Sequence, residues 1–153
     1  MTSRLTPGVA AGTSAPHPAA RRGAVLPFVV GAAAAAGAAL LVVRSPYQPL
    51  SYGICPSVLF LGVYCPGCGG LRATHDMLTG DLVGAWSVNP LWTVAAPLLA
   101  ATWVVWTWRR LRGGPPLTAP RWLPWTVLVV VVAFSVLRNV PVLAPYLSPG
   151  PLP

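Results

Sequence analysis

Three cysteines carry the most reactive side chains of this chain, and all three lie in its central part. Cys65 and Cys68 form a Cys-x-x-Cys pair in the sequence CPGC, and Cys55 lies upstream of them. Two thiolates at this spacing can bind one metal ion from a tight turn, as in zinc knuckles. With His75 downstream, the sequence predicts a possible ligand set of Cys55, Cys65, Cys68 and His75, with zinc as the expected metal.

The same cysteines permit redox chemistry as an alternative. Cys68 lies next to the expected start of a helix, with Arg72 one turn further on, and both features favour the thiolate form. Cys65 and Cys68 would then be a thiol–disulfide exchange pair, with Cys55 as a third thiol. No thioredoxin-like βαβ pattern surrounds them. We therefore interpret the segment first as a structural or metal-binding clip without enzymatic activity, and second as a membrane thiol–disulfide oxidoreductase. Inert thiols are the third interpretation.

Further polar residues follow on a short helix expected at 71–79. Arg72, His75 and Asp76 are spaced i, i+3 and i+4, so they share one face of that helix. This face is either functional or a solvated surface on which Arg72 pairs with Asp76. Asp81 is a good N-cap for a second short helix. The sequence thus predicts a helical hairpin directly after the CPGC turn.

These residues belong to a longer pattern. It consists of an upstream cysteine, Cys-Pro-x-Cys-Gly, Arg-Ala, Gly-Asp, an alanine, and Asn-Pro at the start of an apolar helix. In this pattern the chain resembles a bacterial membrane family known as domain of unknown function 2752, although Leu71 stands where the family often has threonine. The resemblance implies a small integral membrane protein with a cysteine module, and it assigns no reaction. The matching residues are Cys55, Cys65, Pro66, Cys68, Gly69, Arg72, Ala73, Gly80, Asp81, Ala85, Asn89 and Pro90.

Composition and hydropathy also predict a membrane protein. The chain has 153 residues, of which 55% are hydrophobic and only 8% are charged, whereas about a quarter are charged in soluble domains. Three apolar stretches are expected to cross the bilayer as helices, over residues 24–43, 91–108 and 122–143. The last reaches a sufficient length only if Arg138 extends its side chain to the membrane interface.

The expected fold is therefore an all-α integral membrane protein with three transmembrane helices. The cysteine module, residues 55–90, is expected to form a short re-entrant or interfacial helical hairpin between the first two. Residues 1–22 are expected to be a disordered N-terminal tail. Residues 23–143 are expected to form a single membrane domain, and residues 144–153 a proline-rich tail.

The distribution of charge indicates the orientation of the chain. The ten basic residues are all arginines, and the net charge is +8. With the N-terminus in the cytoplasm, seven arginines lie on the inner side and three on the outer side, which agrees with the positive-inside rule. The cysteine module would then be extracytoplasmic, in a multi-pass protein of a bacterial plasma membrane.

The expected partners follow from the same pattern. Most arginines flank apolar stretches, and no basic patch is interleaved with aromatic residues, so we expect no nucleic acid partner. The lipid bilayer surrounds the helices, and small residues on the first helix favour close contact with a membrane-protein partner or a second copy of the chain. A channel or transporter subunit is a further alternative, without an intramembrane charge to mark a pathway.

Overall fold

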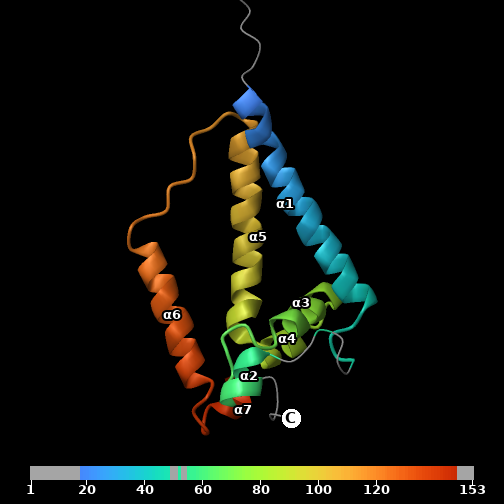
Figure 1. Ribbon diagram of the computed structural model, residues 1–153, viewed down its shortest axis with the longest axis vertical. Coiled ribbons are helices and arrows are strands. Elements are labelled where there is room, and N and C mark those ends of the chain that lie inside the picture. Colours follow the sequence, from blue (N-terminus) through green and yellow to red (C-terminus); the bar gives the residue numbers. More distant parts are fainter. Residues whose placement is uncertain (1–17, 49–51, 53–54, 148–153) are drawn as a thin grey trace, which may run out of the picture.

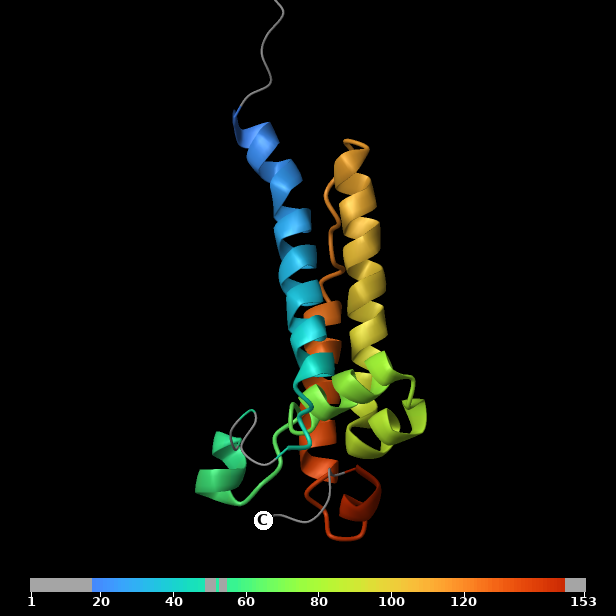
Figure 2. The ribbon, with the colours of Figure 1, turned by 90° about the vertical axis from the view of Figure 1, so that its right-hand side faces the viewer.

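The structure, a computed structural model, describes residues 18–48, 52 and 55–147, with the backbone alone described for residues 18–24. All regular structure in these residues is helical, as the sequence predicts. The described residues form three longer helices that run lengthwise and four short helices that gather toward one end of the molecule (Figures 1 and 2). The longer helices are α1 (Pro18–Val43), α5 (Pro90–Leu111) and α6 (Leu123–Leu137), and the short ones are α2 (Pro56–Leu61), α3 (Gly70–Thr79), α4 (Leu82–Val88) and α7 (Ala144–Leu147).

Two of these helices are long and apolar enough to cross a membrane. They are Val25–Val43 within α1 and the whole of α5. Large apolar side chains project outward from both, with Val29 56% exposed and Leu98 62% exposed. Apolar surface in contact with water costs about 25 cal/mol per Å². An apolar environment around both helices removes that cost.

The third apolar stretch forms a shorter helix than expected. α6 contains 15 residues and ends at Leu137, so it does not continue to residue 143. At about 1.5 Å per residue it spans roughly 22 Å, less than the ~30 Å of a bilayer core. The expected extension of Arg138 toward an interface is wrong, because its side chain is completely buried. Turns at 138–143 follow instead.

Both expected tails contain helical residues where the structure describes them. α1 begins at Pro18, within the segment expected as the N-terminal tail. α7 occupies Ala144–Leu147, within the expected proline-rich tail. The remaining parts of the two tails, residues 1–17 and 148–153, lie outside the described residues.

α1 and α5 contact each other where a glycine faces a tryptophan. The indole N–H of Trp103 in α5 donates a hydrogen bond of 3.2 Å to the carbonyl oxygen of Pro27 in α1. A Cβ atom added to Gly31 would lie 2.5 Å from the Trp103 ring, so the contact requires the absence of a side chain there. The small residues expected to permit close helix packing therefore serve the contact with α5 at this position.

α3 links the longer helices to the cysteine segment, because it packs against α1, α4 and α5. Glycines with left-handed backbone bound it at each end, Gly69 with φ +80° and Gly80 with φ +90°. Glycine adopts this conformation without steric cost, which explains why the helix begins and ends there. Asp81 then caps α4, since its Oδ1 accepts a hydrogen bond of 2.7 Å from the N–H of Gly84. The predicted end of the first short helix and the predicted cap of the second are confirmed.

Candidate metal centre

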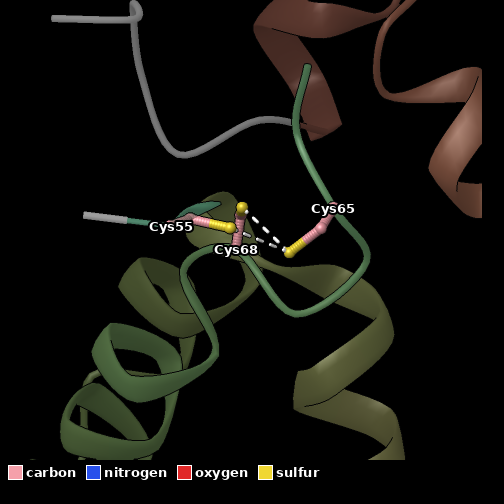
Figure 3. Close-up of side chains that lie close together, drawn as sticks. All are labelled: Cys55, Cys65 and Cys68. Carbon is pink, nitrogen blue, oxygen red and sulfur yellow. Dashed lines mark hydrogen bonds between the residues drawn. The ribbon is translucent and has the colours of Figure 1, made fainter. Parts of the chain in front are cut away.

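The thiols of Cys55, Cys65 and Cys68 point toward one another (Figure 3). The Sγ of Cys65 lies 3.3 Å from that of Cys55 and 3.1 Å from that of Cys68. All three sulfur atoms lie within 4.8 Å of one another, and all three cysteines are free thiols. Such a group can bind one metal ion once the thiols are deprotonated.

Each cysteine is placed by local structure that the sequence explains. Cys55 is the N-cap residue of α2, whose first position is Pro56; proline suits this position because it has no N–H to satisfy. Cys65 and Cys68 lie in one turn, closed by a 3.1 Å hydrogen bond from the N–H of Cys68 to the carbonyl oxygen of Cys65. The pair thus comes from a tight turn, and the third thiol comes from a separate helix start.

Asn89 holds this turn from the beginning of α5. Its side chain is completely buried. Its Nδ2 donates hydrogen bonds of 3.0 Å to the carbonyl oxygens of both Pro66 and Cys68. Its Oδ1 accepts a 2.9 Å hydrogen bond from the N–H of Trp92 and so caps α5. The sequence indicates a turn at Asn89 and Pro90 before the helix. The structure shows that Asn89 also stabilises the cysteine turn through its two hydrogen bonds.

Arg138 holds the same turn from the end of α6. Its Nη1 donates a hydrogen bond of 2.8 Å to the carbonyl oxygen of Cys65, and its Nη2 donates one of 3.2 Å to that of Cys68. The next residue, Asn139, makes two hydrogen bonds with the backbone of Tyr64, of 2.8 and 2.9 Å. Sequence reasoning missed this role of Arg138. The one available signal was an arginine directly after an apolar run.

The thiols of Cys55 and Cys68 differ in acidity. Burial raises the pKa of Cys68 to about 12, and hydrogen bonds with Cys65 and Cys55 contribute to the increase. Burial also raises the pKa of Cys55, but hydrogen bonds from the other two thiols and from the N–H groups of Ser57 and Val58 outweigh it and lower the pKa to about 7. A metal ion bound by all three sulfurs would therefore have to displace a firmly held proton from Cys68.

His75, Arg72 and Asp76 lie outside the thiol group. The Nδ1 of His75 lies 2.8 Å from the carbonyl oxygen of Leu41 near the end of α1. Asp76 is buried and accepts a 2.5 Å hydrogen bond from the hydroxyl of Tyr47. The guanidinium of Arg72 lies 5.5 Å from the centre of the same tyrosine ring. Tyr47 thus contacts both Arg72 and Asp76, which the sequence suggested would pair with each other. His75 does not belong to the group of possible metal ligands that the described residues bring together.

Comparison with known protein families adds one finding about this segment. Residues 55–103 match the family described as "Protein of unknown function (DUF2752)". The match confirms the resemblance seen in the sequence pattern. No curated protein and no solved structure matches the chain.

The DUF2752 match covers part of the site. It includes the three cysteines, the α3–α4 hairpin, Asn89 and the first part of α5. Arg138 lies beyond it, so the cysteine turn is held by one side chain inside the DUF2752 segment and by one outside it.

Proposed function

We propose that this protein is a small membrane-embedded metal-binding module, without enzymatic activity, in which Cys55, Cys65 and Cys68 bind one zinc ion. The observation that carries this proposal is the approach of three free thiols to within 4.8 Å of one another. Thiolates bind zinc well, whereas magnesium and calcium prefer oxygen ligands. The hydrogen bonds from Asn89 and Arg138 to the turn support a site whose ligands are held in place before the ion arrives.

A zinc ion in this site needs a fourth ligand, because protein zinc sites are nearly always four-coordinate. The group formed by the described residues supplies three. We propose that a water molecule or a side chain of a membrane-protein partner takes the fourth position. The site lies in the end of the molecule where the short helices gather (Figure 1), and Cys55 and Cys65 are partly exposed there, which supports the approach of a partner.

We further propose that α1 and α5 cross a bacterial plasma membrane, with the N-terminus in the cytoplasm. Arg109 and Arg110 lie in the last turn of α5, and Arg112 follows it. The cysteine turn lies at the opposite end of α5, at Asn89. Arginines favour the cytoplasmic side, so the cysteine site would face outward. α6 is proposed as a shorter membrane-embedded helix.

The test is metal analysis and thiol counting on the full chain, purified in mild detergent without chelator. We expect about one zinc per chain, lost in the variants Cys55→Ser, Cys65→Ser and Cys68→Ser. Ser57→Ala, two residues from Cys55, is the matched control and should keep its zinc. A wild-type chain with three reactive thiols and no metal would contradict the proposal.

One observation favours a second candidate, a membrane thiol–disulfide oxidoreductase. The sulfur atoms of Cys65 and Cys68 are only 3.1 Å apart, so a small movement would bring them to bonding distance, about 2.05 Å. In this reaction the two thiols form one disulfide while a disulfide in a partner protein becomes two thiols. Cys55→Ser separates the candidates, since it should abolish zinc binding and leave this exchange intact. A reduction potential well below about −300 mV would indicate a structural disulfide.

A further inference from the structure

α6 is joined to the other helices mainly at its C-terminal end. It does not pack extensively along any other helix in the described part of the chain, and it stands apart from α1 and α5 in Figure 1. Its apolar side chains are largely exposed, as at Val129, which is 65% exposed. Arg138 and Asn139 link it to the backbone at residues 64–68, and α7, which follows α6, contacts α4.

The connector before α6 makes few backbone hydrogen bonds, among them a 2.8 Å bond from the N–H of Gly114 to the carbonyl oxygen of Arg109. Residues 114–120 contain no helix or strand, and their sequence, GPPLTAP, is rich in residues that exclude regular structure. The connector therefore does little to hold α6. The position of α6 depends on the binding of Arg138 by the cysteine turn and on the contact of α7 with α4.

We propose that Arg138 couples metal binding at the cysteine site to the docking of α6. This inference rests on the zinc site proposed above, and Arg138 acts in it as a positioning residue. Cys65 and Cys68 would bind the ion through their sulfur atoms and already bind the guanidinium of Arg138 through their carbonyl oxygens. One short turn thus holds both groups.

The geometry explains why the two events depend on each other. The two N–H groups of Arg138 bind both carbonyls only when these lie a fixed distance apart, and a metal ion held by both sulfur atoms restricts the turn that sets this distance. Conversely, a docked Arg138 keeps the turn in the form that places the sulfur atoms together. The metal ion must therefore increase the affinity of the turn for Arg138 by the same factor by which Arg138 increases its affinity for the metal ion.

The form of the side chain matters as well. The Arg138 guanidinium is completely buried and binds the carbonyl oxygens of Cys65 and Cys68 through two of its nitrogens. Lysine keeps the charge but has no planar fork to bind two carbonyls at once.

Trypsin cleavage after Arg138 measures the docking of α6 directly. A completely buried arginine cannot enter a protease, so cleavage between Arg138 and Asn139 requires the end of α6 to be released. We expect this cleavage in the full chain in detergent to be about tenfold slower with zinc than after chelation, as expected for a coupling of typical size. Cleavage after the exposed Arg121 in the same sample is the internal control and should not depend on zinc.

Arg138→Lys tests the role of the guanidinium, because it keeps both the charge and the trypsin site. We expect zinc to bind about tenfold more weakly in this variant and cleavage after residue 138 to depend little on zinc. Arg121→Lys is the matched control, with unchanged zinc affinity.

The outcomes separate the two proposals. A wild-type chain that binds one zinc but is cleaved after Arg138 at the same rate with and without it overturns the coupling and leaves the zinc site standing. A chain that binds no zinc overturns both. The wild-type comparison needs no substitution, so it decides the coupling even if Arg138→Lys does not fold.

Discussion

Asn89 and Arg138 donate hydrogen bonds to the same atom, the carbonyl oxygen of Cys68, over 3.0 and 3.2 Å. Asn89 lies directly before α5, and Arg138 lies directly after α6. A carbonyl oxygen has two lone pairs and can accept both bonds. The cysteine turn thus accepts hydrogen bonds from the ends of two separate helices. A substitution at Asn89 or at Arg138 removes one of these bonds and leaves the other.

Asn89→Ala is expected to weaken zinc binding about 10- to 100-fold, the usual effect of removing a group that orients metal ligands. The substitution removes both hydrogen bonds to the turn and the cap of α5. Asn89→Asp keeps the capping oxygen but replaces the donor by an oxygen that the two carbonyl oxygens repel, so it tests the support of the turn with the cap retained. Isothermal titration with zinc in detergent measures the effect. Ser87→Ala, on an exposed part of α4, is the control. An Asn89→Asp variant with wild-type affinity would show that the turn needs no support from α5.

His75→Gln is expected to keep about one zinc per chain, because the ligand group that the described residues form consists of three thiols. The ring of His75 instead contacts the carbonyl oxygen of Leu41. Loss of that hydrogen bond should lower the free energy of unfolding by about 1 kcal/mol. Metal analysis beside Cys55→Ser, which should lose zinc, measures the difference. If His75→Gln also lost its zinc, His75 would have to move to become the fourth ligand.

Gly31→Leu is expected to lower the free energy of unfolding in detergent by about 1–3 kcal/mol, because a side chain at this position overpacks the contact with Trp103. The matched control is Gly37→Leu in the same helix, because a Cβ at Gly37 meets nothing within 4 Å. Thermal unfolding followed by circular dichroism compares the two. Equal midpoints would mean that α1 and α5 do not meet at Trp103.

Tyr47→Phe is expected to destabilise the protein more at pH 9 than above pH 11. Burial and the hydrogen bond to Asp76 raise the pKa of Tyr47 to about 12, whereas the unfolded chain has the ordinary value of about 10. The stability that this hydroxyl contributes is therefore fully present below about pH 10 and is lost as the pH rises toward 12. The measurement is the difference in thermal midpoint between wild type and variant at each pH. A difference that stays constant would contradict the Tyr47–Asp76 bond.

Local features of this protein were predictable from the sequence, because neighbouring residues determine them. Gly80 ends one short helix because glycine tolerates a left-handed backbone. Asp81 begins the next because its side chain accepts a hydrogen bond from a backbone N–H group. The apolar runs predict the longer helices because hydropathy is likewise a property of neighbouring residues. The Cys-Pro-Gly-Cys turn could likewise be expected to bring two thiols together.

Only the tertiary structure decided which distant groups meet. The sequence does not show whether an arginine after an apolar run reaches a membrane interface or folds inward. Arg138 folds inward because the carbonyl oxygens of Cys65 and Cys68 accept hydrogen bonds from its guanidinium. His75 contacts the carbonyl oxygen of Leu41 in α1, and Asp76 accepts a hydrogen bond from Tyr47, which follows α1. Helix spacing predicted neither partner. Periodicity and spacing determine which residues share a helix face. The packing of helices determines which hydrogen-bond partner each buried polar group finds, and that partner is distant in the sequence.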